Sequence, residues 1–371
     1  MANFKVDFYG HVRQYHGLKQ EIDSTILEVL ESGKYVQGPT LTRFEKELGA
    51  YFKMKHAIGV NSGTDALWLA FMALGIGKGD EVITVANTFF ATAEAIWIAG
   101  AKAVFVDIDP VTRNIDANLI EAAITPKTKA IVPVHLYGQT ADMQAISKIA
   151  KKHNLLVIED CAQAFGAAGN NFAIGELSDA VCTSFIIQKN LGTFGDGGAV
   201  ITNRDDIPDR ILALRNHGSL KRSCHRMGYN SRLDDLHAGV LSVKLKHIDE
   251  WNDKRRQIAA QYDEQLADTS LVLPTEKDGY RHVYHLYVIE HDKRDELQAF
   301  LLDEEIRALT HYPIAIHQQE GYPWDQPADP NLSLPLTEKS AARVLSLPMY
   351  PELTQEELDM TIDAILRWDK S

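Results

Sequence analysis

Cysteines and long uncharged runs are scarce in this sequence. Only three of its 371 residues are cysteines, Cys161, Cys182 and Cys224, and no two of them form a C-x-x-C pair. An odd number of distant thiols gives little support to a disulfide framework or a structural metal, and it favours a reducing cytoplasm. The uncharged stretches 66–77 and 82–93 each have twelve residues, whereas a membrane-spanning helix needs roughly 20. We therefore expect a cytoplasmic protein with neither a membrane span nor a metal site.

A net positive charge is also absent. The chain has 38 Lys and Arg residues against 51 Asp and Glu residues, which gives a formal net charge of −13. A surface of this sign disfavours binding to nucleic acids and to anionic membranes, so neither is an expected partner. An anionic small molecule would need a local site lined by cations or backbone amides.

The sequence does contain a regular alternation of strand-like and helix-like segments. Helix-like segments lie at 64–74, 93–100, 116–124 and 142–153. The expected strands are 56–60, 81–85, 103–108, 130–134, 155–160, 180–185 and 198–202. Such alternation predicts βαβ units, and so an α/β fold with a mostly parallel sheet flanked by helices. Ligands of these sheets bind beyond the carboxyl ends of the strands.

The pattern changes after about residue 205. Helical spacing of apolar residues extends over 232–267, and a strand-like run follows at 284–290,. Helix-like segments lie at 295–306 and 354–368, and the second begins with Thr354 and Glu357 at the spacing of a capping box,. We expect a large α/β domain over residues 1–250 and a smaller α+β domain over residues 251–371.

Lys189 is the one cation in the stretch SFIIQKNLGTFGDGG, residues 184–198. The plain interpretation is a surface lysine before a glycine-rich hairpin with an Asp-Gly turn. The alternative is an amine that does chemistry. A free lysine has a pKa of about 10.4 and is almost fully charged at pH 7, so this role needs an apolar setting or a Schiff base.

Two further segments fall at the same predicted edge of the sheet. EDCAQA, residues 159–164, places Asp160 at the end of a buried strand, where it could pair with a protonated ring nitrogen. NSGTDAL, residues 61–67, offers hydroxyls and free amides at a strand-to-helix turn, where phosphate can bind,. Each segment alone is also explained by a simple helix cap. Together with Lys189 they indicate a pyridoxal-phosphate pocket.

At this point the sequence resembles the DegT/DnrJ/EryC1/StrS family of sugar aminotransferases. The resemblance covers nearly the whole chain and implies the fold of aspartate aminotransferase (fold type I), with a pyridoxal 5′-phosphate cofactor that passes through pyridoxamine 5′-phosphate. The segments that carry it include SGKYVQGPTLTRFEKELGAYF (32–52), NSGTDAL, GDEVITVANTFFATAEAI (79–96), IEDCAQAFGA (158–167), KNLGTFGDGGAVIT (189–202), GYNSRLDDLHAGVL (228–241) and HYPIAIHQQEGY (311–322).

The resemblance implies a role for each matching residue. Lys189 matches the lysine that forms the Schiff base and moves the proton, and Asp160 matches the aspartate facing the ring nitrogen. Phe89 matches the aromatic residue stacked on the ring, and Gln163 the residue near the ring hydroxyl. Asn230 matches the asparagine that reaches the cofactor phosphate of a neighbouring subunit, which implies a homodimer with shared active sites. The phosphate contacts are expected from Gly63, Thr64, Asp65 and Ser184.

Substrate contacts are expected from a second group of residues. The basic segment 221–226 could hold a diphosphate, although a solvated loop explains it equally well. The family usually has a tyrosine and a proline shortly before the lysine, whereas this chain has Ile186, Ile187 and Gln188 there, which leaves its sugar preference open. The candidate substrate residues are Tyr35, Lys221, Arg222, His225, Tyr312 and His317.

The expected reaction moves an amino group from L-glutamate to a nucleotide-linked keto-deoxysugar. A 3-keto-6-deoxyhexose is preferred, because the segment 228–252 looks more like that of members acting at C3 than at C4. A 4-keto sugar and a cyclitol ketone remain alternatives within the family. A pyridoxamine-phosphate-dependent sugar dehydratase is a further alternative, but those relatives have histidine in place of Lys189. The last alternative is a non-catalytic regulatory protein with the same fold.

Overall fold

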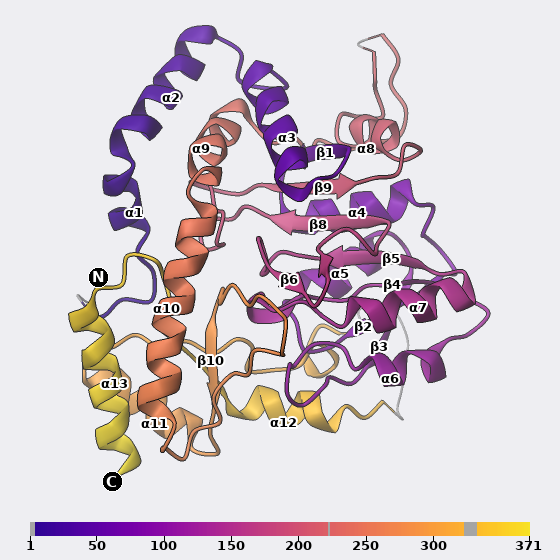
Figure 1. Cartoon of the computed structure of the whole chain (residues 1–371). Helices are drawn as coiled ribbons and strands as arrows, with labels where there is room; N and C mark the ends of the chain where they lie inside the picture. The colour runs from indigo at the N-terminus through magenta and orange to yellow at the C-terminus, as the bar shows by residue number, and fades with distance from the viewer. Residues whose placement is uncertain (1–3, 222, 323–331) are drawn as a thin grey trace.

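The computed structural model describes residues 4–221, 223–322 and 332–371 (Figure 1). Within them the centre is a sheet with strand order β1-β9-β8-β5-β4-β2-β3. Strand β9 runs antiparallel to both of its neighbours, and the other strands share one direction, which confirms the mostly parallel α/β sheet. The strands are β1 (His56–Val60), β2 (Glu81–Val85), β3 (Lys102–Val106), β4 (Thr128–Ile131), β5 (Leu156–Asp160), β8 (Ala180–Ser184) and β9 (Gly198–Thr202).

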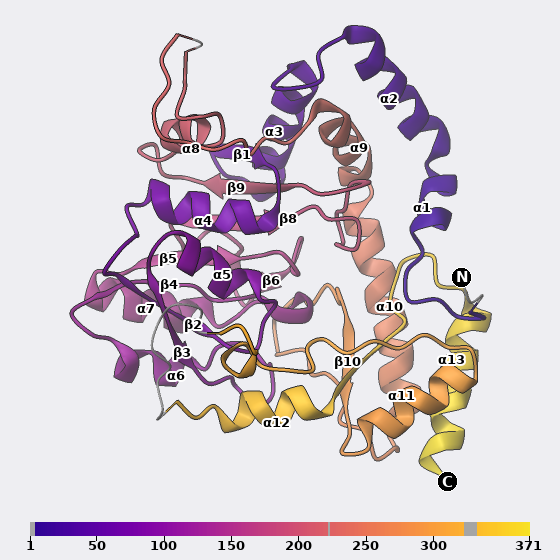
Figure 2. The same cartoon turned by 180° about the vertical axis from the view of Figure 1, so that it is seen from behind.

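Helices cover both faces of the sheet. Neighbouring residues of one strand point to opposite faces, so Val200 packs in the apolar cluster under α4 and α5 while Ile201 packs in the cluster under α3 and α9. Figure 2 shows α4 and α5 in front of the sheet. The helices of this part are α3 (Pro39–Phe52), α4 (Gly63–Ala73), α5 (Ala91–Ile98), α6 (Ala117–Ile120), α7 (Met143–His153), α8 (Pro208–Leu214) and α9 (Asp235–Leu245).

The predicted helical region 232–267 contains two helices, α9 and α10 (Ile248–Leu266). The chain turns between them, where the His247 amide donates to the Lys244 carbonyl at 3.0 Å, three residues back. Helix α10 then runs without a break across residue 250, so the expected domain limit falls within a helix and stays a prediction.

The C-terminal part forms a smaller layer beside the large sheet. Strands β10 (Tyr287–Glu290) and β11 (Val344–Leu347) pair antiparallel and pack with α10, α11 (Arg294–Asp303) and α13 (Gln355–Asp369) around their own apolar cluster. Thr354 and Glu357 form the predicted capping box at the start of α13. Other short elements are α12 (Pro335–Arg343), β6 (Ala168–Gly169), β7 (Phe172–Ala173), η1 (Glu121–Ala123), η2 (Leu136–Gly138) and η3 (Ile316–Gln318).

The N-terminal segment joins this smaller layer. The Lys5 amide donates to the Glu305 carbonyl at 3.0 Å, and Val6 forms a parallel bridge with Ile306. Helices α1 (His11–Gly17) and α2 (Lys19–Ser32) follow, and both guanidinium NH2 groups of Arg13 bind the carboxylate of Glu357 in α13, at 2.7 and 2.6 Å. None of the described helices is both long enough and apolar enough to cross a membrane.

Candidate active site

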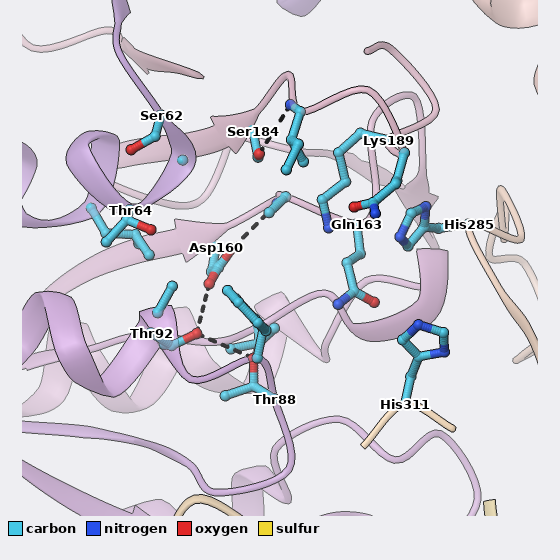
Figure 3. Close-up of a pocket in the computed structure, with 18 of the residues that line it drawn as sticks. Ser62, Thr64, Thr88, Thr92, Asp160, Gln163, Ser184, Lys189, His285 and His311 are labelled. Carbon is cyan, nitrogen blue, oxygen red and sulfur yellow. Dashed lines mark hydrogen bonds between the residues drawn. The ribbon is translucent and has the colours of Figure 1, made fainter. Parts of the chain in front are cut away.

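A cavity of about 390 Å³ opens where β5 and β8 end (Figure 3). This is the edge at which ligands bind in open α/β sheets, and the volume suits a small molecule or cofactor. Within the described residues, the structure brings together eight of the residues predicted for the site. They are Gly63, Thr64, Phe89, Asp160, Gln163, Ser184, Lys189 and Tyr312.

Lys189 stands on the turn that follows β8, and its side chain is partly buried. The next residue fixes this turn, because Nδ2 of Asn190 donates to Asn252 Oδ1 at 2.8 Å and to the Val283 carbonyl at 3.1 Å. Burial lowers the pKa of Lys189 to about 8, while the charge of Asp160 acts in the opposite direction. A large fraction of the amine is therefore neutral near pH 8, as a nucleophile or base requires.

Asp160 ends β5 and is only 5% exposed. Its Oδ2 accepts a hydrogen bond from the Thr92 hydroxyl at 2.8 Å, and its Oδ1 accepts one from the Ala162 amide at 3.2 Å. Burial raises the pKa of Asp160, although these two donors and the charge of Lys189 favour the ionised form. A carboxylate in this setting would be stabilised by a protonated ring nitrogen, so it fits a pyridoxal cofactor.

The opposite end of the cavity is built on the first turn of α4. Gly63 begins this helix, and a Cβ atom at this position would lie 2.6 Å from the Cβ of Ser184. The helix therefore packs closely against the end of β8, and Thr64 and Ser184 both reach the cavity wall. The free amides and the dipole of a helix N-terminus favour a phosphate at this place.

Gln163 and two aromatic residues form another part of the wall. The Tyr137 amide donates to Gln163 Oε1 at 2.9 Å, and Gln163 Nε2 donates to the Tyr312 hydroxyl at 3.1 Å. The rings of Phe89 and Tyr312 lie 5.8 Å apart between centroids, and Phe89 is 55% exposed. Because both ends of the amide are bonded, Gln163 holds a fixed orientation beside the place expected for the cofactor ring.

Two histidines complete the side near Lys189 (Figure 3). Burial and then the charge of Lys189 lower the pKa of His285 well below its usual value and that of His311 to about 4. Since Asn190 uses its amide nitrogen elsewhere, its Oδ1 accepts from His285 Nδ1 at 3.1 Å. His311 Nδ1 lies 2.9 Å from the Ser346 hydroxyl. Both imidazoles are thus neutral at pH 7.

Several residues of this wall were not predicted from the sequence, among them Tyr9, Thr88, Thr92 and His285. Tyr9 comes from the N-terminal segment and His285 from the stretch just before β10, both far along the chain from the motifs. No local pattern marks either as part of the site. Thr88 and Thr92 flank Phe89 in the segment NTFFAT, where the aromatic residue is the only one with a distinctive signal.

Other predicted residues lie outside this wall. Tyr35 donates from its hydroxyl to the Leu30 carbonyl at 2.9 Å, and His317 Nε2 lies 3.0 Å from Glu338 Oε1. The Asp65 amide donates to the Ser62 hydroxyl at 3.0 Å as part of the helix cap. Arg222 falls outside the described residues. Three exposed residues lie on the segment between α8 and α9, which projects from the body at the top of Figure 1: Lys221, His225 and Asn230.

The same chain matches the DegT/DnrJ/EryC1/StrS aminotransferase family over residues 17–366. The chain belongs to this family. A "Pleiotropic regulatory protein" of Geobacillus stearothermophilus is 49% identical over 95% of this chain and 95% of that protein. The dTDP-3-amino-3,4,6-trideoxy-alpha-D-glucose transaminase of Streptomyces venezuelae is 43% identical over 98% and 96%. The crystal structure of S. venezuelae DesV in complex with a ketimine intermediate aligns over 100% of both chains, with a TM-score of 0.96 and 42% identity.

The protein is therefore a pyridoxal-phosphate-dependent aminotransferase of fold type I. The residues on the cavity wall fit the cofactor: an amine of lowered pKa, a buried carboxylate, and a helix N-terminus at the far end. When bound, the cofactor supplies an electron-accepting ring that stabilises negative charge on the carbon that loses a proton. The contacts of the individual side chains with it remain proposals.

Proposed function

We propose that the enzyme transfers the amino group of L-glutamate to the C3 ketone of a nucleotide-linked deoxysugar. The observation that carries this proposal is the position of Lys189 and Asp160 on the wall of one cavity. The S. venezuelae transaminase supports the choice of substrate, because its name places the amino group on C3 of a dTDP-linked sugar.

Lys189 carries the proton in this proposal. In the first half of the reaction its neutral Nζ takes the proton from the α-carbon of the amino donor. In the second half the same atom delivers a proton to the sugar carbon that receives the nitrogen. A single group can serve as base and then as acid when its pKa lies near the working pH, which the lowered pKa of about 8 allows,.

The cofactor contacts are assigned to the other wall residues. Asp160 pairs with the ring nitrogen, Gln163 with the ring hydroxyl, and Phe89 lies on one face of the ring. The phosphate is held by the first turn of α4 and by the hydroxyl of Ser184. Support comes from the burial of Asp160, the fixed amide of Gln163 and the close packing of Gly63 on Ser184.

The diphosphate of the sugar nucleotide needs positive charge beyond what this wall offers. Lys189 is the one Lys or Arg among its described residues, and its neutral form is the reactive one. Lys221, His225 and Arg226 lie exposed on the projecting segment between α8 and α9, just before Asn230. We place them in the active site of a second copy of the chain, so that a symmetric homodimer completes both sites.

The test compares two sugar ketones with glutamate as the donor. The purified enzyme is incubated with a 3-keto and, separately, a 4-keto nucleotide sugar, and amino-sugar formation is followed by mass spectrometry. We expect turnover with the 3-keto substrate. Lys189→Ala should lose at least about 10³-fold in rate, and borohydride reduction should leave cofactor on the Lys189 peptide of the wild-type enzyme only. Turnover of the 4-keto sugar alone would contradict the C3 assignment.

A regulatory role is the second candidate, because the relative at 49% identity is named a regulatory protein. The presence of Lys189, Asp160 and the α4 turn on one wall favours catalysis. If the purified protein binds the cofactor but turns over neither ketone nor glutamate, the regulatory candidate gains support.

A further inference from the structure

A chain of two hydroxyl groups leads to Asp160 within the cavity wall (Figure 3). The Thr92 Oγ1 atom lies 2.8 Å from Asp160 Oδ2 and 3.1 Å from the Thr88 Oγ1 atom. The side chains are almost fully buried, with exposed fractions of 1% for Thr92, 4% for Thr88 and 5% for Asp160. Thr92 lies in the first turn of α5 and Thr88 in the loop just before that helix, whereas Asp160 comes from the end of β5.

The direction of these hydrogen bonds follows from the donors available. An ionised carboxylate only accepts, and a threonine hydroxyl has one proton to give. The proton of Thr92 is therefore used on Asp160, so the 3.1 Å contact between the hydroxyls is made by the proton of Thr88. Hydrogen bonds in such a chain polarise one another, which makes the terminal donor stronger.

We infer that Thr88 and Thr92 are positioning residues that hold Asp160 ionised and oriented for the ring nitrogen of the cofactor. The Thr92 hydroxyl occupies one lone pair of Oδ2 and the Ala162 amide one of Oδ1, so each oxygen keeps a further lone pair for a ring N–H,. The inference rests on the proposed contact between Asp160 and that nitrogen.

The hydrogen-bonded chain from Thr88 through Thr92 to Asp160, called the threonine relay below, counteracts the effect of burial on the pKa of the carboxyl group. Burial raises the pKa of Asp160, and Thr92 is the strongest of the groups that lower it. The charge of Lys189 also lowers its pKa, and so does that of His135 in its protonated form. Cys161, Cys182 and Tyr312 interact with its charge as well, but burial raises the pKa of each, so they stay neutral near pH 8.

The test measures cofactor affinity in the apo protein rather than turnover. Thr92→Val keeps the shape of the side chain and removes the hydroxyl, Thr92→Ser keeps the hydroxyl, and Thr88→Val removes only the first donor. Dissociation constants for pyridoxal 5′-phosphate are measured by quenching of intrinsic fluorescence. They are compared with those for the analogue that has carbon in place of the ring nitrogen.

We expect about tenfold weaker binding of pyridoxal 5′-phosphate by Thr92→Val and about threefold weaker binding by Thr88→Val. Thr92→Ser should bind like the wild type, and all variants should bind the carbon analogue equally. Removing a donor from the ionised carboxylate raises its pKa. The fall in affinity on acidification should therefore begin about one pH unit higher in Thr92→Val.

Each other outcome overturns the inference in a recognisable way. If the wild type binds both ligands equally, the contact between Asp160 and the ring nitrogen is wrong. If the wild type and Thr92→Val both bind pyridoxal phosphate more tightly than the carbon analogue, and by the same factor, the contact between Asp160 and the ring nitrogen is supported. The proposed role of the threonine relay is then wrong. Equal weakening of both ligands in Thr92→Val means that the threonine only maintains the local packing, and weak binding by Thr92→Ser means the same.

Discussion

Lys189 and Asp160 each change the proton affinity of the other. Burial favours the neutral form of both groups, so it lowers the pKa of the amine to about 8 and raises that of the carboxyl. The attraction between their charged forms acts in the opposite direction on each group. The protonation state of the site is thus set by two residues together, and a change to one should be visible in the titration of the other.

This coupling predicts the pH dependence of cofactor capture by the apo protein. A protonated amine is not a nucleophile, so the rate of covalent attachment should rise with pH and level off near pH 8, well below the usual lysine pKa of 10.5,. Asp160→Asn removes a charge that raises the pKa of Lys189, and its rate should level off at lower pH. Stopped-flow absorbance measures both profiles. A rate that keeps rising to about pH 10.5 would contradict the lowered pKa.

A fully buried lysine on a helix holds the loop that follows Lys189 in place. Lys244, on α9, is 1% exposed, and its Nζ donates to the Gly192 carbonyl at 2.7 Å. Burial lowers its pKa to about 8 from the usual 10.5. Between these two values the unfolded chain binds more protons than the folded protein at this site, so the free energy of unfolding rises with pH there.

Lys244→Met should therefore remove part of the pH dependence of stability. Between pH 8 and 10 the unfolding free energy of the variant should rise less steeply than that of the wild type, by about 2 kcal/mol over the window. Urea unfolding of the apo protein at both pH values measures it. The control is Lys246→Met, whose side chain is 65% exposed and whose pH dependence should match the wild type. Identical slopes for Lys244→Met and the wild type would refute the argument.

At the same scale, sequence reasoning picked out two ionisable residues at the ends of apolar strands. Lys189 follows β8 and Asp160 is the last residue of β5, and an ionisable side chain is unusual in such a place. Thr92 gave no such signal because a threonine in the first turn of a helix is ordinary. Tyr9 and His285 reach the site only through the folding of distant segments, which one-dimensional patterns do not encode.

At the scale of secondary-structure elements, helix α4 and strand β8 are in close contact at the proposed phosphate end of the cavity. Gly63 starts α4, and no side chain fits between it and Ser184. This contact places the first turn of the helix beside the hydroxyls that are proposed to hold the phosphate. The geometry of the phosphate end therefore depends on packing between two elements.

Gly63→Ala should disturb that end of the cavity. The new Cβ would lie 2.6 Å from the Ser184 Cβ, and relief of this overlap should cost about 1–3 kcal/mol in unfolding free energy. Weaker binding of pyridoxal 5′-phosphate should accompany it. Gly17→Ala is the matched control, because a Cβ at the end of α1 meets nothing within 4 Å. Calorimetry and a cofactor titration check both variants; equal behaviour of the two would contradict the argument.

The order and type of the elements could be predicted because strands and helices alternate with clear apolar patterns. The runs 56–60, 81–85 and 198–202 match β1, β2 and β9 residue for residue. The region 232–267 did not match a single helix, because apolar spacing continues through the turn at His247 and hides it. A turn between two helices depends on a few backbone hydrogen bonds, and these have little effect on the spacing of apolar residues in the sequence.

At the scale of the whole molecule, the proposed sharing of active sites between two subunits makes a prediction about mixed dimers. Lys189→Ala and Asn230→Ala should each be nearly inactive, because each removes one residue from every site. After co-refolding at equal amounts, half of the dimers are mixed. If Asn230 serves the other subunit, each mixed dimer has one intact site, so activity should return to about a quarter of the wild type. Unmixed samples are the control, and an absence of recovery would contradict sharing.

The pairing of the first residues with the smaller layer has a practical consequence. Tyr9 reaches the cavity wall from a segment that is held by Glu305 and Ile306 and, through Arg13, by Glu357. A purification tag fused ahead of this segment could displace Tyr9 from the cavity wall, and a truncation that includes Tyr9 would remove it. The exposed end at Ser371 is the better attachment point for tags, labels and surface immobilisation.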